Sequence, residues 1–599
     1  MLAHSFHIPV MGLGYTIDTP ARVARYGISS VVSIVEDNLI EKMRKFYSEK
    51  IGVNYKEITL KDEDYRARRI TEYLNLIKKI VDEQFDSLKK EAFEIGTEIH
   101  KYFDLLPDTA ELKKMYHDFL TAVGQEKDRI EKQIRESLVK GSIDVNIMTK
   151  LDKFNYDKNG EQLPPEFCDA MAALRGFANS DLESGIVFSA GLNPRLFSYC
   201  ASFSDFFPNA EGKIKKQIIL KVSDNRSALI QGKFLAKKGL WVSEFRVESG
   251  LNCGGHAFAS GGSLVGPILE DFKNKREELR AELQQMCQKT WTEMGIAETN
   301  PELKITVQGG VGTAHEHEFL LDFYKVDSVG WGSPFLMVPE AVSIDEDSMN
   351  LLINAKKDDY FLSDASPLGV PFNNVKNTSS VALINRNIEK NRPGSACYKK
   401  FLQFNTEFTK IPICTASREY QNNKIKQMAL PETPQKEIER GNEIIKVKEC
   451  LCEGLASSAL LSHGIMPDRN LDAVSLCPGP NLAYFSGRFS LKEMIGHIYG
   501  HNNLLNQAVH RPHVFVNEIE LNIKYLKNHI QKFTEETIEQ KNKFVDGYKS
   551  TLNEGIAYYK NLLNSIKNES VEFLENMQKD LFRLEEEIAE IAVTEEVMA

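Results

Sequence analysis

The chain has 599 residues, of which 42% are hydrophobic and 27% are charged. This balance is ordinary for a globular protein, and the length predicts either several domains or one domain with large insertions. The formal net charge of −11 argues against a nucleic-acid partner, because such partners usually require a basic face. No apolar run approaches the roughly 18 residues of a membrane span, so no membrane partner is expected.

The N-terminal segment and the cysteines bear on the cellular compartment in which the protein is expected. The opening segment, MLAHSFHIPVMGLGY, lacks the basic start and the apolar core of a secretory signal. The nine cysteines are odd in number and unevenly spaced, which fits reduced thiols better than a disulfide framework. A cytoplasmic location is therefore expected.

Eight short apolar segments recur along the chain, and helix-like segments separate most of them. They are residues 8–12, 28–35, 143–148, 185–190, 217–222, 242–248, 305–307 and 327–331. Nearly continuous apolar runs suit strands that are buried on both faces of a parallel sheet. Since eight such strands close a (β/α)8 barrel, the sequence predicts an α/β protein with a TIM barrel formed by residues 1–35 and 143–345.

A helical insertion is predicted after the second strand. Residues 36–142 are polar, charged and helical in pattern. Their apolar positions fall on one helical stripe, which consists of Ile70, Leu74, Ile77, Val81 and Leu88. A packing or lid element is the expected role.

The chain after the barrel divides into two regions. Residues 346–510 are predicted to form an irregular and helical extension that packs on the barrel, with loops over 418–439. Residues 511–599 are predicted to be helical. Their apolar seam can pair with another helix, either of the same chain or of a homo-oligomer; it consists of Ile519, Ile523, Leu526, Ile530 and Phe533.

Two consecutive strands end in glycine turns. The seventh strand stops at Gly309–Gly310, and the eighth stops at Gly332–Ser333. Bare backbone N–H groups, each followed by a helix N-terminus, favour an anion. The last two strands of a TIM barrel hold a phosphate in this way. Either turn alone would be an ordinary loop, but the pair predicts a phosphate site.

The sixth strand leads into the segment ESGLNCGGHA, residues 248–257. Gly254 and Gly255 let the backbone approach a flat ligand, and His256 can exchange a proton near neutral pH. Lys221, at the rim of the fifth strand, is either a cation facing a ligand or a surface lysine. Cys253 is either a redox-active thiol or a small buried residue.

Metal sites are not expected. In a helix His315 and His317 point about 200° apart, which is poor for one ion. The spacing of three later cysteines differs from that of zinc sites, so core thiols are expected at Cys450, Cys452 and Cys477.

Several segments together resemble the nitronate monooxygenase (2-nitropropane dioxygenase) family and its flavin-dependent enoyl reductase relatives. Three of them are GGHAF, VQGGVGT and DSVGWGSPFLMVPEA. Two later ones are SDASPLGVPFNNVKN and residues 450–487, which include SLCPGPNLAYFSGR. The resemblance covers about residues 6–35 and 143–500. It leaves the helical insertion and the C-terminal helices without a counterpart.

The resemblance implies FMN as the cofactor and a role for each matching residue. The phosphate-loop match is Gly310, next to Gly309, and the last phosphate-binding segment matches Gly330, Trp331, Gly332 and Ser333. Asn146 matches an Asn that faces the flavin, Gly254 matches the first glycine of the GGH motif, and His256 matches the catalytic histidine. Two departures occur. Gly330 replaces a common Gln, and the first-strand turn is Val10–Met11–Gly12, where Met11 and Gly12 keep backbone contacts.

The resemblance further implies an FMN-dependent oxidoreductase acting on alkyl nitronates or a similar small carbon acid. The alternative is a flavin-dependent enoyl (acyl carrier protein) reductase, which adds NAD(P)H to the small-molecule partners. A non-catalytic scaffold with partner-binding helices is a third hypothesis.

Overall fold

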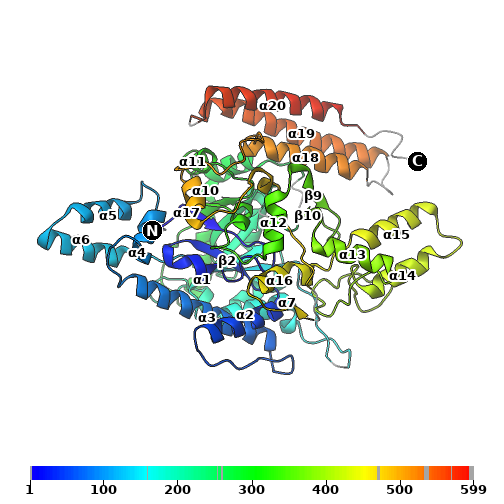
Figure 1. Ribbon diagram of the computed structural model, residues 1–599, viewed down its shortest axis with the longest axis horizontal. Coiled ribbons are helices and arrows are strands. Elements are labelled where there is room, and N and C mark those ends of the chain that lie inside the picture. Colours follow the sequence, from blue (N-terminus) through cyan, green and yellow to red (C-terminus); the bar gives the residue numbers. More distant parts are fainter. Residues whose placement is uncertain are drawn as a thin grey trace.

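A computed structural model describes residues 3–157, 159–189, 191–252, 254–257, 261–468, 472–531, 538–567 and 569–592. Eight parallel strands form a closed barrel in chain order (Figure 1). They are β1 (Phe6–Ile8), β2 (Ser29–Ser33), β3 (Ile143–Met148), β4 (Ser184–Ser189), β5 (Lys216–Val222), β6 (Val242–Glu248), β7 (Lys304–Gln308) and β8 (Ser328–Gly330). Pairing of His7 with Gly330 closes the barrel. The predicted TIM barrel is confirmed.

Strand positions match the apolar segments closely, and the first strand differs most. β1 ends at Ile8 rather than at residue 12. Pro9 has no N–H to donate to a ladder, and Gly12 has a φ of 54°, which belongs to a turn. The fourth predicted strand ends at Ala190, which lies outside the described residues.

Helices surround the barrel between its strands. They are α1 (Thr19–Val23), α7 (Asp169–Ala178), α8 (Pro194–Tyr199), α9 (Asn225–Ala236), α10 (Val265–Glu293) and α11 (Ala314–Asp322). Short 3₁₀ helices are η1 (Ala24–Tyr26), η2 (Pro165–Phe167), η3 (Cys200–Ser202), η4 (Ser204–Phe206), η5 (Ser333–Met337), η6 (Lys357–Asp359), η8 (Pro480–Tyr484) and η9 (Leu563–Ser565).

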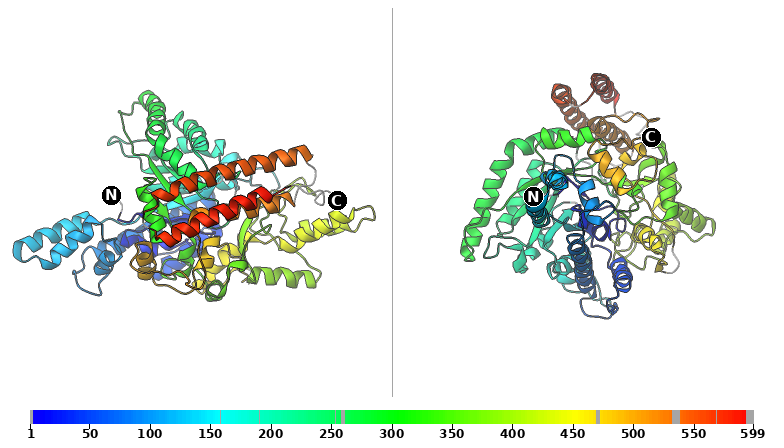
Figure 2. Two further views of the ribbon diagram at one scale, coloured as in Figure 1. Left: turned by 90° about the horizontal axis from the view of Figure 1, so that it is seen from above. Right: turned by 60° about the vertical axis from the view of Figure 1, so that its left-hand side comes forward.

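The segment between β2 and β3 is helical, as predicted. It comprises α2 (Asp37–Lys50), α3 (Tyr65–Leu88), α4 (Glu98–Leu105), α5 (Glu111–Thr121) and α6 (Gly124–Ser137). The stripe on α3 is buried, and α3 packs against α1, α2 and α7. This helix therefore belongs to the ring around the barrel, whereas α5 and α6 project away from it (Figures 1 and 2).

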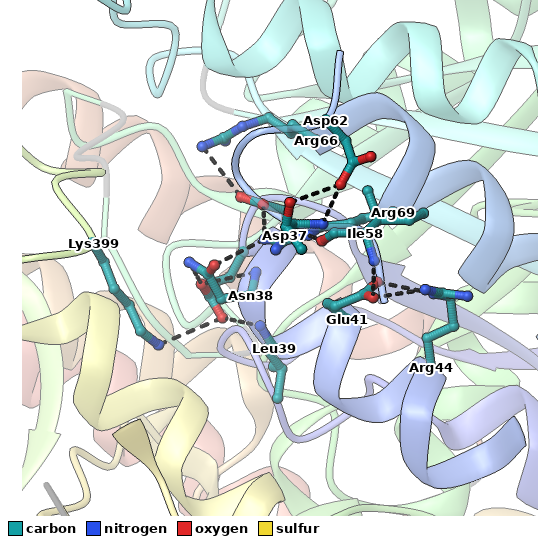
Figure 3. Close-up of polar contacts among 12 residues, drawn as sticks. Asp37, Asn38, Leu39, Glu41, Arg44, Ile58, Asp62, Arg66, Arg69 and Lys399 are labelled. Atoms are coloured by element: carbon teal, nitrogen blue, oxygen red, sulfur yellow. Dashed lines mark hydrogen bonds and ion pairs between the residues drawn. The ribbon is translucent and has the colours of Figure 1, made fainter. Parts of the chain in front are cut away.

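A buried ion network holds the start of this segment (Figure 3). Asp37 at the N-terminus of α2 accepts from Arg69 at 2.8 Å and lies 3.2 Å from Arg66. Lys399, from the extension, lies 3.5 Å from the carboxylate of Glu36. The network thus ties the β2–α2 corner to both α3 and the extension.

The extension contains more regular structure than predicted. It comprises α12 (Glu346–Asn354), the antiparallel pair β9 (Tyr360–Ser363) and β10 (Phe372–Val375), α13 (Ser379–Glu389), α14 (Arg418–Met428), α15 (Gln435–Val447), α16 (Leu451–Ser462) and α17 (Leu491–Ile498). The prediction of loops over 418–439 was wrong, because Ser417 caps α14 through the Tyr420 N–H. The pair α14 and α15 projects from the body (Figure 1).

The chain ends in α18 (Val514–Ile530), α19 (Ile538–Leu562) and α20 (Val571–Glu590), which lie together (Figures 1 and 2). Four members of the predicted seam, Ile519, Ile523, Leu526 and Ile530, are buried on α18, whereas Phe533 lies outside the described residues. α18 contacts α19 and α20, so the seam pairs within the chain. No helix of the described residues is long and apolar enough to cross a membrane.

Candidate functional site at the barrel mouth

A cavity of about 140 Å³ lies at the carboxyl ends of the barrel strands. Its barrel side includes Asn146, Ser189, Lys221, Glu248 and His256. The extension covers the other side with apolar groups, namely Phe372, Phe401, Leu402, Leu451 and Leu455. Active sites of TIM barrels lie at this end.

Polar side chains from four neighbouring strands meet on the cavity floor. Asn146 on β3 accepts a hydrogen bond from Ser189 on β4 at 2.5 Å. Lys221 on β5 and Glu248 on β6 form an ion pair at 2.7 Å. The lysine is therefore a cation in the cavity wall, with only 14% of its side chain exposed, rather than a surface lysine.

His256 lies in the cavity wall beside the extension. Its Nε2 is 2.6 Å from Ser366 Oγ, and its ring packs edge-on against Phe372. Burial, and then the charge of Lys150, lower the pKa of His256 to about 4. The imidazole is therefore neutral at pH 7, able to donate and accept hydrogen bonds but weak as a base.

Gly254 and Gly255 face a segment of the extension. Gly254 pairs with Pro478, and the Gly255 N–H donates to the Cys477 carbonyl at 3.2 Å. A Cβ on Gly254 would lie 2.1 Å from that carbonyl oxygen, whereas a Cβ on Gly255 would meet nothing within 4 Å. The backbone contact therefore requires glycine at the first position, and the second borders open space.

This difference predicts unequal effects of two alanine substitutions. Both glycines have positive φ, 115° and 79°, so either substitution strains the backbone by about 1–3 kcal/mol. Gly254→Ala also forces the Cys477 carbonyl away, at a further cost of about 1–3 kcal/mol. We expect chemical denaturation to show Gly254→Ala as clearly less stable than its control, Gly255→Ala. Equal stabilities would mean that residues 477–479 do not pack here in solution.

The two predicted phosphate turns lie side by side. Gln308 on β7 pairs with Gly330 on β8. Gly310 comes two residues after Gln308, and Gly332 comes two residues after Gly330, so the two turns begin from neighbouring positions. Within the described part of the chain, the N–H groups of Gly310, Val311 and Gly332 donate no hydrogen bond to the protein, although all three residues are buried. Orphaned buried N–H groups are rare, so an acceptor from outside the chain is the expected partner. Gly309 is buried beside Asn252, and the Ser333 hydroxyl accepts from the Gly479 N–H at 2.8 Å.

The N-terminus of α11 is already neutralised by the chain. Glu316, in its first turn, accepts from the Gly312 N–H at 2.9 Å and from the Val514 N–H at 2.7 Å. Arg511 binds both oxygens of this carboxylate at 2.7 and 2.9 Å. Glu316 therefore occupies the helix end that was expected to contribute to anion binding. The backbone N–H groups of the two turns remain as candidate donors to an anion.

Apart from the two phosphate turns, three predicted residues do not line the cavity. Met11 is buried, and its N–H is 3.3 Å from Thr16 Oγ1; its neighbour Gly12 does line the cavity. Gly330 faces the barrel interior, where a Cβ would meet Gln308 and His7. Trp331 donates through its backbone to His7 and through its ring to His317. The structure thus groups Gly12, Asn146, Lys221, Gly254, Gly255 and His256 in the cavity wall, and Gly310, Gly332 and Ser333 at the turns.

No metal-binding cluster occurs among the described residues. His317 is buried against Ser5 and Trp331, while His315 is half-exposed beside Glu569. Cys450, Cys452 and Cys477 are free thiols in largely buried positions. Cys253 lies outside the described residues.

Sequence reasoning missed several polar members of the site. Glu248 and Gln308 are the last residues of their strands and are joined at 2.7 Å. The period-two alternation of strands could have placed them inward. Ser366 carried no such signal, because it reaches His256 from a loop 110 residues away.

No protein-family model matches the chain, and no curated protein matches it. Among solved structures, it is similar to the enoyl reductase domain of MlnA from the macrolactin biosynthesis cluster of Bacillus amyloliquefaciens. The identity is 12% and the TM-score 0.31, over 75% of this chain and 89% of that one. The barrel assignment rests on the strand pairing of the chain itself.

Proposed function

We propose that the chain is an FMN-dependent oxidoreductase that oxidises alkyl nitronates or a similar small carbon acid, with an alkyl nitronate as the first candidate. The observation that carries the proposal is the set of three buried turn amides that have no protein acceptor among the described residues. The β7 turn packs at Gly309 against Asn252, which lines the cavity that contains His256. The amides suit the dianionic end of a mononucleotide. The GGH, QGGVG and GWGS segments resemble those of the nitronate monooxygenases and support the same cofactor.

The residues present fit the two ends of FMN. Gly310, Val311 and Gly332 would hold the phosphate, and Asn146, Lys221, Gly254 and Gly255 would border the ring. The cavity of about 140 Å³ is smaller than the roughly 300 Å³ of common ligand sites. Residues 477–479, which bridge Gly254 and Ser333, would therefore shift to admit the ring. When bound, FMN supplies the electron transfer.

The chain would bind and orient the substrate. Ser366 fixes the imidazole of His256, which can then hydrogen-bond the reacting group. A histidine with a pKa of about 4 abstracts a carbon-bound proton poorly, since an efficient base has a pKa near the working pH. A substrate that arrives already ionised, such as a nitronate, avoids this step. Lys221 lies in the same wall, where Glu248 balances its charge at 2.7 Å.

His256→Ala is expected to slow turnover of an alkyl nitronate by about 10²-fold, because the reacting group loses one hydrogen-bond donor, while the FMN content stays unchanged. The FMN content should not change because the His256 side chain lines the cavity, and the residues of the two phosphate turns are not part of that lining. His256→Asn retains a hydrogen-bonding group next to Ser366 and should recover part of the rate. Steady-state kinetics on flavin-loaded protein measure both variants. An unchanged rate in the alanine variant would remove His256 from the mechanism.

A reductase is the second candidate, and the apolar half of the cavity favours it. Phe372, Phe401 and Leu455 offer more apolar surface than a small polar substrate needs. An acyl chain would bury this surface. In that case NADH or NADPH would reduce the flavin before an enoyl substrate binds. An anaerobic reductant screen separates the two candidates. Bleaching of the bound flavin by an alkyl nitronate supports nitronate oxidation, and bleaching by NAD(P)H supports the reductase. Protein that takes up no FMN would support the non-catalytic scaffold.

A further inference from the structure

A single carboxyl group holds both ends of the loop between β6 and α10, residues 249–264. The carboxyl belongs to Glu518 on α18. Its Oε1 accepts from the Ser249 hydroxyl at 2.7 Å and from the Gly250 N–H at 3.1 Å. Its Oε2 accepts from the Val265 N–H at 2.8 Å. One side chain of the C-terminal helices thus fastens the start and the end of this loop to a common point.

A chain of hydrogen bonds leads from the start of the loop to His256. Ser249, which Glu518 holds, accepts through its carbonyl from the Asn252 N–H at 3.0 Å. The side-chain amide of Asn252 donates to the His256 carbonyl at 2.9 Å. The side-chain oxygen of Asn252 accepts from Asn373 of the extension at 2.7 Å. The position of His256 in the cavity wall is therefore set from two sides, by α18 and by the extension.

The end of the loop packs on the C-terminal helices as well. A Cβ on Gly262 would lie 3.1 Å from the carbonyl oxygen of Tyr548, a residue of α19. Gly555, also on α19, leaves room for Leu264, since a Cβ there would lie 2.4 Å from the Leu264 side chain. The described end of the loop therefore rests on a helix for which the family resemblance offers no counterpart.

The Glu518 carboxyl is costly for the stability of the fold. Only 1% of the residue is exposed, and burial is the largest influence on its pKa, which is raised. Hydrogen bonds oppose this effect, and no cation of the described residues is among these influences; the donors are Val265, Ser249, Gly250 and Tyr559. A buried carboxyl without a counter-charge stabilises a fold less than an apolar side chain of similar size. The loop that Glu518 holds explains its presence better than stability does.

We propose that Glu518 is a positioning residue that keeps His256 in the cavity wall by fastening both ends of its loop. What His256 does there rests on the proposed function, whereas the fastening rests on the contacts of Glu518 itself. Glu518 is not among the residues that line the cavity, so it acts on a ligand only through the loop. The C-terminal helices thereby take part in the site.

Removal of the carboxyl should loosen the loop without unfolding the barrel. The two loop ends then lose their common anchor, and the segment between them opens more easily. His256 should consequently spend less time beside Ser366, its partner at 2.6 Å. The contacts of the loop with the extension remain, because the Gly255 N–H still donates to the Cys477 carbonyl.

The test measures amide hydrogen exchange of residues 249–265 in the full-length protein by mass spectrometry. In Glu518→Ala these amides should exchange about tenfold faster or more, the equivalent of one lost hydrogen bond to a charged group. Glu518→Gln keeps one acceptor oxygen and can hold one end of the loop, so its exchange should lie between the alanine variant and the wild type. Glu520→Gln is the matched control. It removes the same charge from the same helix, where Glu520 pairs with Arg583 at 2.9 Å, and should exchange like the wild type.

Turnover of an alkyl nitronate by the flavin-loaded variants is the second readout. In Glu518→Ala kcat should fall about tenfold, because a displaced group loses part of its effect, whereas the FMN affinity should stay unchanged. Glu518→Gln should recover part of kcat.

Exchange that stays at the wild-type rate in residues 249–265 would overturn the proposal. Exchange that rises equally in all barrel strands would do the same, since it would mark Glu518 as a residue of general stability. If the alanine variant fails to fold, the glutamine variant decides between these outcomes. A wild-type protein that turns over no nitronate would contradict the proposed function, and the exchange measurement would still decide whether Glu518 fastens the loop.

Discussion

FMN should bind this protein far more tightly than riboflavin does. The two ligands share the ring and differ only in the phosphate, so their affinity ratio reports on the turns after β7 and β8. Gly310, Val311 and Gly332 offer three buried N–H groups without protein acceptors among the described residues. Hydrogen bonds to a charged acceptor contribute about 1.5–3 kcal/mol each. Two such hydrogen bonds predict that the affinity for FMN exceeds the affinity for riboflavin by a factor on the order of 10³.

Quenching of flavin fluorescence on titration with the purified protein measures both affinities. Inorganic phosphate should compete with FMN and leave riboflavin unaffected. Lys221→Gln is a useful control, since Lys221 borders the cavity and not the turns. This variant should weaken both flavins equally and preserve their ratio. Affinities within threefold of each other would show that the turn amides do not receive a phosphate, and the FMN proposal would fail with them.

The barrel was predictable because its signals are local. Residues 143–148 and 242–248 read as strands from their own apolar content, and the structure has strands at those positions. The adjacency of the two glycine turns also followed from chain order, because consecutive strands of a barrel are neighbours. Register then places Gly310 next to Gly332 without any long-range information.

The covering of the site was not predictable, because it depends on contacts between segments far apart in sequence. Cys477 reaches Gly255, Ser366 reaches His256, and Arg511 reaches Glu316. None of these pairs has a periodicity or a spacing that marks it. The role of the α11 N-terminus was misjudged for this reason: a helix start followed by His-Glu-His looks open to an anion until the partner from residue 511 is known.

Arg511→Met should destabilise the protein by about 3–5 kcal/mol, because it leaves a carboxylate buried without its counter-charge. Glu316 is 1% exposed and Arg511 is 3% exposed at the side chain. Arg511 also donates to the Gly310 carbonyl at 2.8 Å and to the Asn481 side chain at 3.1 Å. One guanidinium thus joins the β7 turn, α11 and the extension. Chemical denaturation at pH 7 measures the loss.

The double variant Glu316→Gln/Arg511→Met is the matched control. Glutamine keeps one acceptor oxygen, so it can accept from one of the Gly312 and Val514 N–H groups, which donate to different oxygens of Glu316, and the buried charge is gone. This protein should therefore be more stable than Arg511→Met alone. If the double variant is equally unstable, the loss comes from the packing and hydrogen bonds of Arg511 rather than from the unpaired carboxylate.

The pH dependence of stability tests the role of the Glu316 charge independently of the double variant. Burial raises the pKa of Glu316, but the charge of Arg511 outweighs this effect, aided by His513, and the net pKa is lowered. In the wild type the pair therefore contributes stability above the unfolded-state pKa of roughly 4.3, and this contribution is lost as the pH falls through the folded-state pKa. Without Arg511, burial dominates and the folded-state pKa rises. Protonation of Glu316 then removes the unpaired buried charge of Arg511→Met as the pH falls. The difference in unfolding free energy between the wild type and Arg511→Met should therefore shrink from pH 7 to pH 4. A difference that stays constant over this range would mean that the Glu316 charge is not what Arg511 compensates.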